Sequence, residues 1–430
     1  MATIGACGEW IVSTCDSKLI SIHTKQDREP FVFDCSAAEK KLKDTESDNK
    51  SDDGGADETG HDVILAVAVS PTGRLAALTD DSKRLVLFRC DSPWQCISTR
   101  WVVRRCTSLV FSQAEDQLLV ADKSGDVYSF SVEEPHRAGE LKLGHLSMLL
   151  ALTLSPDDRY VISADRDEKI RVSHLKSPHN IQAFCLAHRE FVSSLLIPAA
   201  HREWLLSGSG DGNVILWQYE SGRELQRWDM RKLREAPDGT KEGEEEEKRS
   251  AVSRITSSPD GLHVVVQCER AATVQMLSLV KGTEDRLTPS HQLTLPHCPL
   301  DITFDPRGRL WVLLDSADTP FQVYTHTQDG WQCDAENAEV SRVTEALKPY
   351  WKALQPLAVA ESRFEHLYKV NFDNMESYME KKRLRLEQQK SHWGKKRTTG
   401  DGNETPGKKS TTGSGNHTPG KKRSKENKVK

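Results

Sequence analysis

The sequence contains histidine and aspartate residues that could be catalytic, because these residue types act as general acids and bases in enzymes. His188 and Asp211 lie in one short stretch, and His145 precedes them. An imidazole beside a carboxylate can move a proton during catalysis. The same side chains can instead be buried hydrogen-bonding groups that link strands. Their spacing decides between the two interpretations.

The stretch from His188 to Trp217 predicts three short β-strands. Its β-like runs are 191–197, 204–207 and 213–219, and a proline and a glycine-rich turn separate them. His188 stands 29 residues before Trp217, where the third strand closes.

The same spacing recurs one unit earlier, where His145 stands 28 residues before Ser173, another closing position. Residues that recur with the period of the architecture serve the architecture, so we interpret His145, His188 and Asp211 as structural. Asp167 stands six residues before Ser173, as Asp211 does before Trp217, and we assign it the same role.

The repeating unit extends along most of the chain. Third strands close at Phe88, Phe130, Ser173 and Trp217, with successive gaps of 42, 43 and 44 residues. A period of roughly 40–45 residues with several strands per unit is typical of a β-propeller. Counting further triplets gives about seven units, so we predict an all-β, seven-bladed propeller. We expect the extreme N-terminus to pair with the last unit near 321–325 and so close the ring.

The domain organisation follows from composition. We predict a propeller over 1–345, interrupted by acidic, disordered loops at about 37–60 and 235–249. A C-terminal extension, 346–392, should contain a basic helix that begins near Asp373, because Asp373 and Glu376 have capping-box spacing. The low-complexity remainder, 393–430, should be a disordered basic tail.

Charge and cysteine usage exclude several classes of function. The net charge is −5, but residues 381–430 alone carry +12, so the tail is suited to phosphates or an acidic partner. No Cys-x-x-Cys occurs among the ten cysteines, and no apolar run is long enough to span a membrane. We therefore expect no metal and no membrane. No glycine-rich strand–turn–helix that could hold a cofactor occurs either, so we expect no cofactor and no small-molecule substrate. The basic groups 395–397 and 421–425 are suited to nuclear import, and a solvated tail is the alternative. We expect the protein in the nucleus, with a cytoplasmic pool as well.

Three successive inter-strand turns are rich in charge. The turn at 164–171 carries Asp165, Arg166, Glu168, Lys169 and Arg171, and we assign a role in the fold only to Asp167. Lys123 with Asp122 occupies the same turn one unit earlier, and Asp80, Asp81 and Lys83 occupy it one unit before that. These turns could form one docking surface for a charged partner. Solvated hairpins are the alternative.

The segment Ser207-Gly-Ser-Gly-Asp211-Gly-Asn-Val-Ile-Leu-Trp217 resembles a WD-repeat blade. In that family a histidine, a serine, an aspartate and a tryptophan link three strands by hydrogen bonds. The resemblance implies that His188, Ser207, Asp211 and Trp217 form this group.

A narrower resemblance is carried by Val120-Ala-Asp-Lys-Ser-Gly-Asp-Val-Tyr and Ala164-Asp-Arg-Asp-Glu-Lys-Ile-Arg171. Both are similar to the non-catalytic WD-repeat subunit of the eukaryotic tRNA guanine-N7 methyltransferase, and the similarity covers roughly 30–390. In that family the propeller is not an enzyme. It stabilises a separate catalytic subunit, which binds S-adenosylmethionine and methylates a guanosine in the tRNA variable loop.

The resemblance implies roles for particular residues. Contacts with the catalytic subunit of the heterodimer are implied for Arg166, Glu168, Lys169 and Arg171, with Lys123 nearby. Contacts with the tRNA backbone are implied for the basic helix, through Lys381, Lys382, Arg383 and Arg385. The chain also carries Trp228-Asp-Met-Arg231, a pattern of WD-repeat receptors in ubiquitin ligases. A substrate receptor of a cullin ubiquitin ligase, or a chromatin scaffold, therefore stays open as an alternative.

Overall fold

The computed structural model describes residues 2–40, 60–234, 250–282, 285–334, 337–351 and 362–369, together with Met379, Lys382 and Arg383. Most of each predicted acidic loop, and all of the predicted tail, lie outside the described residues. The first compact unit of the chain is Met1–Lys369.

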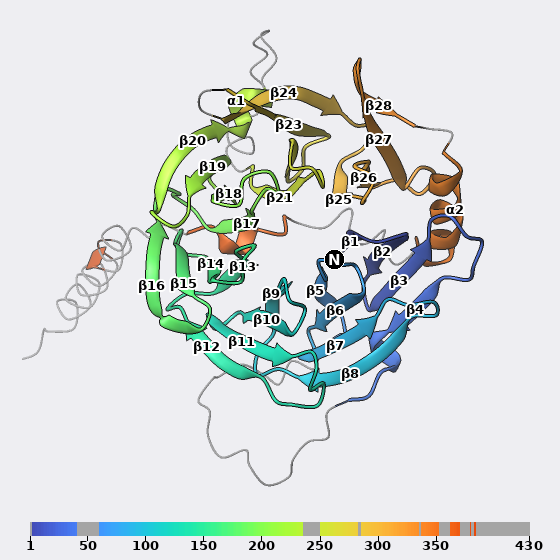
Figure 1. Ribbon diagram of the computed structural model, residues 1–430, viewed down its shortest axis with the longest axis horizontal. Coiled ribbons are helices and arrows are strands. Elements are labelled where there is room, and N and C mark those ends of the chain that lie inside the picture. The colour runs from blue at the N-terminus through green and yellow to red at the C-terminus, as the bar shows by residue number, and fades with distance from the viewer. Residues whose placement is uncertain are drawn as a thin grey trace, which may run out of the picture. The chain divides into compact units, whose positions relative to one another are not determined.

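Seven four-stranded antiparallel sheets surround a common centre (Figure 1). Each sheet is a blade built from four consecutive strands, so the predicted seven-bladed propeller is confirmed. The blades are, in chain order, blade 1 (β1 Thr3–Cys7, β2 Trp10–Cys15, β3 Lys18–His23, β4 Phe31–Asp34), blade 2 (β5 Ile64–Val69, β6 Leu75–Asp80, β7 Arg84–Arg89, β8 Gln95–Trp101), blade 3 (β9 Cys106–Phe111, β10 Gln117–Asp122, β11 Asp126–Ser131, β12 Glu140–Gly144), blade 4 (β13 Leu149–Leu154, β14 Tyr160–Asp165, β15 Ile170–His174, β16 Ser177–Cys185), blade 5 (β17 Val192–Leu196, β18 Trp204–Ser209, β19 Asn213–Gln218, β20 Arg223–Asp229), blade 6 (β21 Val252–Ser257, β22 His263–Cys268, β23 Thr273–Val280, β24 Arg286–Thr294) and blade 7 (β25 Pro299–Phe304, β26 Leu310–Leu314, β27 Phe321–Thr327, β28 Gly330–Cys333).

Short helical segments lie between and after the blades. They are α1 Met230–Arg234, α2 Ala338–Leu347 and the 3-10 turns η1 Cys35–Ala37, η2 Lys348–Tyr350 and η3 Glu365–Leu367.

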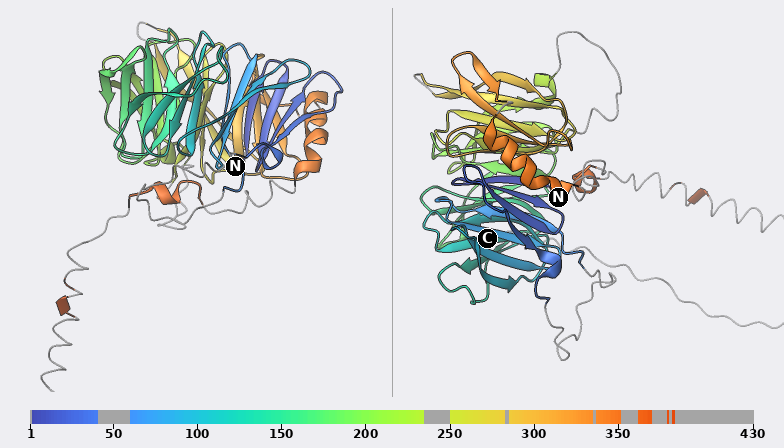
Figure 2. Two further views of the ribbon diagram at one scale, coloured as in Figure 1. Left: turned by 90° about the horizontal axis from the view of Figure 1, so that it is seen from below. Right: turned by 90° about the vertical axis from the view of Figure 1, so that its right-hand side faces the viewer.

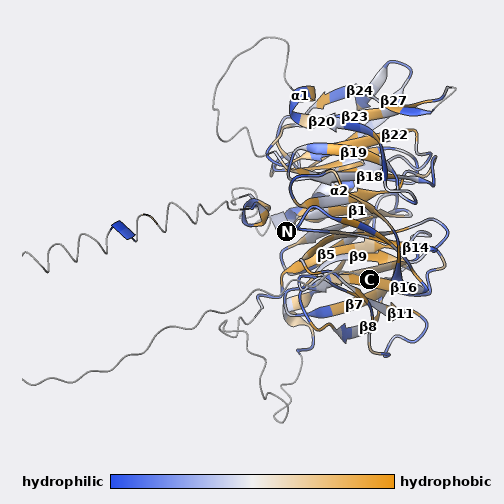
Figure 3. Ribbon diagram, turned by 90° about the vertical axis from the view of Figure 1, so that its left-hand side faces the viewer, coloured by the Kyte–Doolittle hydropathy of each residue, from blue (hydrophilic) through white to orange (hydrophobic). Residues whose placement is uncertain are grey.

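The core lies between the blades. The second strands are buried along nearly their whole length, and all six residues of β14 are buried, because a neighbouring sheet covers each of their faces. The outer strand β16 is largely exposed. Figure 3 shows apolar residues concentrated in the strands and polar residues in the connecting turns.

The ring closes differently from our expectation. The N-terminal strand β1 pairs with β2 in its own blade, so the predicted pairing with the last blade is wrong. Blade 7 already has four strands of its own and offers β1 no vacant edge. Instead, the Ile4 backbone amide donates to Asp301 Oδ2 of β25 at 2.9 Å.

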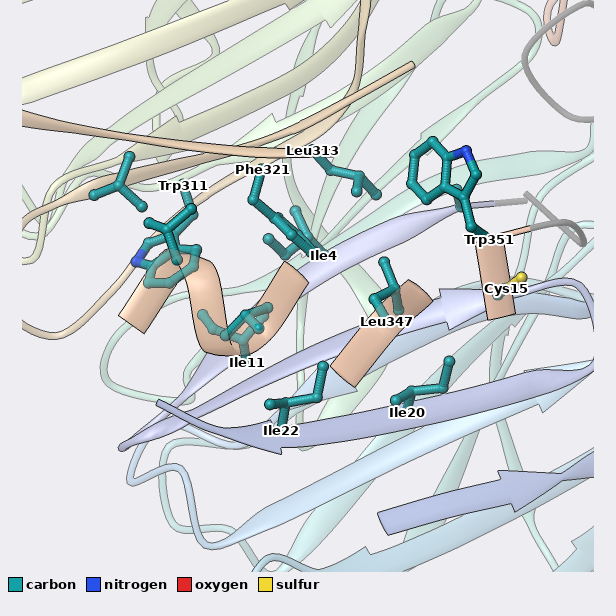
Figure 4. Packing of buried hydrophobic residues seen from close by; sticks show 14 residues of the cluster. Ile4, Ile11, Cys15, Ile20, Ile22, Trp311, Leu313, Phe321, Leu347 and Trp351 are labelled. Atoms are coloured by element: carbon teal, nitrogen blue, oxygen red, sulfur yellow. The ribbon is translucent and has the colours of Figure 1, made fainter. Parts of the chain in front are cut away.

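Helix α2 covers this seam between the first and last blades (Figure 4). Its buried residues Val340, Val343 and Leu347 pack with Ile22 of blade 1 and Trp311 of blade 7. Asn337 caps the helix by accepting a hydrogen bond from the Glu339 amide at 2.8 Å. We did not predict α2.

The compact unit also extends beyond the predicted boundary at residue 345. Residues 362–369 pack onto the propeller through the buried side chains of Phe364, Leu367 and Tyr368. Figure 2 shows η3 lying against one face of the disc that the blades form.

Candidate docking surface

The four residues of the blade 5 group are hydrogen-bonded as the resemblance implied. His188 Nδ1 lies 3.1 Å from Asp211 Oδ2, and His188 Nε2 lies 2.7 Å from Ser207 Oγ. Trp217 Nε1 donates to the same Ser207 oxygen at 2.8 Å. Since a carboxylate only accepts, Nδ1 carries the proton, and Ser207 then donates to Nε2. Ser207 is fully buried and its hydroxyl is engaged, so this group links strands and offers no accessible nucleophile.

The blade 4 group corrects our assignment of Asp167. His145 Nδ1 lies 3.0 Å from Asp165 Oδ2, and His145 Nε2 lies 2.8 Å from Ser163 Oγ. The structural carboxylate is therefore Asp165, at the end of β14. In blade 5 the corresponding strand-end residue is Ser209, and the carboxylate comes from Asp211, two residues further on. Counting back from the third strand could not distinguish these two positions.

The protonation of Asp211 provides the first testable prediction. Burial raises the pKa of this carboxyl, but hydrogen bonds from His188 and from the backbone amides of Arg189 and Asn213 outweigh burial and hold the pKa below its ordinary value. The unfolded chain therefore takes up the proton first as pH falls, so this stabilisation is present above about pH 4 and is lost below it.

An Asp211→Asn variant should accordingly have a lower unfolding midpoint than wild type at neutral pH. Between about pH 5 and 3, the midpoint of the variant should fall less than that of wild type. Thermal unfolding of both proteins across that range measures this. Parallel pH profiles would show that Asp211 does not carry the effect.

The charged turns of blades 2, 3 and 4 all connect a second strand to a third, so they emerge on the same face of the disc. Hydrogen bonds through Arg105 join the turns of blades 2 and 3. The Lys123 amide donates to the Arg105 carbonyl at 3.1 Å, and the Arg105 side-chain Nε donates to the Asp81 carbonyl at 3.1 Å. Lys83 and Lys123 are exposed. We call this face, with the turns 81–83, 123–125 and 166–169, the docking face.

Asp80 does not belong to this surface. It is fully buried and accepts from Arg84 Nε at 2.6 Å. The fully buried Arg84 guanidinium also contacts Asp62 and donates to the Glu39 carbonyl at 3.1 Å. Burial raises the pKa of Asp80, and the hydrogen bonds from Arg84 oppose that rise. Our sequence interpretation had treated Asp80 as a turn residue and did not consider Arg84.

The blade 4 turn contacts a segment distant in sequence. Arg166 Nε donates to the Leu367 carbonyl at 3.1 Å, and Glu168 forms an ion pair with Lys369. Lys169 is exposed, and its ammonium donates to the Asp167 carbonyl at 3.1 Å. The structure therefore places Arg166, Glu168 and Lys169 in one turn, as predicted, and adds residues 367–369, for which we had predicted no contact with this turn.

Arg171 lies beside this turn on β15 and is half-buried. One terminal nitrogen donates to the Gly144 carbonyl of blade 3 at 2.9 Å, while its buried Nε has no hydrogen-bond partner among the described residues. Burial lowers the pKa of the Arg171 guanidinium, and the charge of Asp165 partly offsets this. A half-buried guanidinium with donors to spare is suited to bind an incoming carboxylate in a forked geometry.

Two of the four predicted RNA-contacting residues are outside the described part of the chain. Lys381 and Arg385 lie outside it, and Lys382 and Arg383 are helical and exposed. Within the residues described, no group of three or more histidine, cysteine, aspartate or glutamate side chains could hold a metal ion. None of the helices among those residues is long and apolar enough to cross a membrane.

The ubiquitin-receptor pattern also has a clear position. Trp228 and Asp229 end β20, the fourth strand of blade 5, and Arg231 lies in α1. Arg231 Nε donates to Asp229 Oδ1 at 3.1 Å. In the ubiquitin-ligase receptors, the pattern stands at the end of a blade's third strand. In this protein the third strand of blade 5, β19, ends at Gln218, so the pattern stands one strand later.

The fold and the linked strands define a WD-repeat β-propeller with a charged docking face. Residues 6–140 and 132–332 match the family model described as the tRNA methyltransferase TRM82 WD40 domain. A Danio rerio protein called tRNA (guanine-N(7)-)-methyltransferase non-catalytic subunit is 58% identical over 388 residues, which cover 90% of this chain and 92% of the relative. The Homo sapiens protein of that description is 43% identical over 380 residues, covering 88% and 89%. The chain belongs to this family of non-catalytic subunits.

A solved structure shares the fold. The RRP9 WD40 repeats superpose with a TM-score of 0.57 at 20% identity, covering 73% of this chain and 86% of that one.

Proposed function

We propose that this protein is the scaffold of a tRNA guanine-N7 methyltransferase, binding the catalytic subunit through the docking face and helping to position tRNA. The observation that carries the proposal is the set of charged turns that blades 2, 3 and 4 place on one face of the disc, in a chain whose relatives are named non-catalytic subunits. Lys123, Arg166, Lys169 and Arg171 supply cationic groups there, and Glu168 supplies an anionic one.

The physical role of such a scaffold is preorganisation. Its strands are fixed by hydrogen bonds and packed sheets, so the docking face loses little freedom when a partner binds. A catalytic subunit held on this face would lose conformational freedom before tRNA arrives. The entropy of ordering the active site would then not oppose binding of the RNA.

The basic stretch that includes Lys381, Lys382, Arg383 and Arg385 would add contacts with phosphates of the tRNA. Such contacts release counterions, so they raise affinity for any tRNA and weaken as salt rises. Nuclear residence, directed by the basic groups at 395–397 and 421–425, completes the proposal.

Reconstitution with the catalytic subunit tests the function. We expect neither this protein alone nor RNA alone to form N7-methylguanosine, and the heterodimer to methylate tRNA faster than the catalytic subunit by itself. Methylation by this protein alone, or no change when it is added to the catalytic subunit, would contradict the proposal. Purification of the native complex with a cullin adaptor but without a methyltransferase would favour the receptor alternative.

A further inference from the structure

A short C-terminal segment lies across the docking face beside the blade 4 turn. We call residues Ser362–Lys369 the anchor. Phe364, Leu367 and Tyr368 are buried in one cluster with Phe191 and Ala251. The Phe191 ring centroid lies 5.5 Å from that of Phe364 and 5.0 Å from that of Tyr368. These contacts give the anchor an apolar base of its own on the propeller.

Polar contacts hold both ends of the anchor. At its start, Glu269 accepts from Ser362 Oγ at 2.6 Å and from the Arg363 amide at 2.7 Å. At its end, the Tyr368 hydroxyl donates to the Gly210 carbonyl at 3.2 Å. Aromatic packing and hydrogen bonds to blades 5 and 6 therefore fix where Leu367 and Lys369 lie.

The anchor in turn orders two side chains of the docking face. The Leu367 carbonyl accepts from Arg166 Nε, and Lys369 pairs with Glu168, in contacts separated by 201 residues in sequence. The Leu367 carbonyl is neutral, so it does not offset the positive charge of Arg166. The other two nitrogens of the Arg166 guanidinium have no hydrogen-bond partner among the described residues. Lys369 offsets the charge of Glu168, and this bond raises the pKa of Lys369 above its ordinary value.

Resting on the function proposed above, we infer that the anchor is an integral part of the docking surface. It positions Arg166, and its Lys369 offsets Glu168, so the charges of the turn 166–169, which otherwise cancel, become net positive. With Lys169 and Arg171 alongside, this surface fits a partner that presents carboxylates. Arg166 and Glu168 contact the partner in an arrangement that the anchor, through Tyr368, maintains.

The test is the Kd of the reconstituted heterodimer for wild type, Tyr368→Ala and Lys369→Ala. We expect each variant to raise Kd, by roughly tenfold for Tyr368→Ala. Relative to Arg166→Ala alone, the double variant Tyr368→Ala/Arg166→Ala should raise Kd by much less than tenfold, because both changes disrupt one arrangement. Additive effects would overturn the role of the anchor in positioning Arg166.

Lys369→Ala distinguishes a loss of binding from a loss of folding. It removes none of the apolar contacts of the anchor, so it still tests the inference if Tyr368→Ala lowers the unfolding midpoint. Unchanged or tighter binding by Lys369→Ala would overturn the inference, and tighter binding would mean that the anchor competes with the partner. If wild type itself fails to bind the catalytic subunit, the proposed function fails rather than this inference alone. Arg223→Ala, an exposed arginine of β20, is the matched control and should leave Kd unchanged.

Discussion

Replacement of Arg171 by leucine should weaken the heterodimer by about 2–5 kcal/mol, because a partner carboxylate that docks here would remain desolvated and unpaired. That loss corresponds to a Kd raised by about 30-fold to 5,000-fold. Arg171 is suited to this role because it is half-buried and makes one hydrogen bond within the described residues, to Gly144. Isothermal titration or biolayer interferometry with the purified catalytic subunit would measure the change, and tRNA methylation at limiting protein should fall with it.

Two controls separate binding from folding in this experiment. The bond to Gly144 joins blades 3 and 4, so the unfolding midpoint of the Arg171→Leu variant must be measured as well. Arg223→Leu makes the same chemical change on an exposed site of β20 and should leave Kd unaltered. Binding by Arg171→Leu within twofold of wild type would exclude Arg171 from the interface.

The second large effect concerns stability. An Arg84→Met variant should lose about 3–5 kcal/mol of folding free energy, because removing one partner of a buried ion pair leaves the other uncompensated. Arg84 and Asp80 are fully buried, and Asp62 is nearly so. Without the guanidinium, the pKa of Asp80 would rise further, since burial already raises it. The destabilisation should therefore be larger at pH 8 than at pH 5.

Thermal unfolding measures this effect, with a midpoint lowered by about 5 °C or more for a chain of this size. Arg89→Met is the matched control, since Arg89 is an exposed arginine on the same strand, β7, and should change stability by less than about 0.5 kcal/mol. Equal midpoints for the two variants would refute the importance of the buried network.

The propeller was predictable because its information is local and repeated. Each blade is a contiguous segment, and strand closures such as Phe130 and Trp217 recur with nearly constant spacing. The blade 5 group was predictable because a histidine, a serine, an aspartate and a tryptophan within one repeat carry its hydrogen bonds. The choice of Asp167 instead of Asp165 failed because two carboxylates stand two residues apart, and only the turn geometry decides which one faces His145.

The anchor and the ring closure were beyond sequence reasoning for a different physical reason. Their contacts join residues about 200 to 300 positions apart, such as Arg166 with Leu367 and Ile4 with Asp301. No periodicity records such pairs. Weak local signals were present, since Asn337 precedes apolar residues at helical spacing, and Phe364, Leu367 and Tyr368 interrupt a polar region. These signals show that a segment is buried but not what it packs against.

The self-contained first blade has a consequence for synthesis on the ribosome. Because β1 pairs within its own sheet, each blade can form from residues that emerge consecutively, and no blade waits for a strand from the far end of the chain. Only the last steps need both ends, when blade 7 packs against blade 1 and α2 covers the seam between them. Until blade 7 has emerged, the nascent protein is an open arc with two uncovered sheet faces, the interval in which a chaperone would have most to shield.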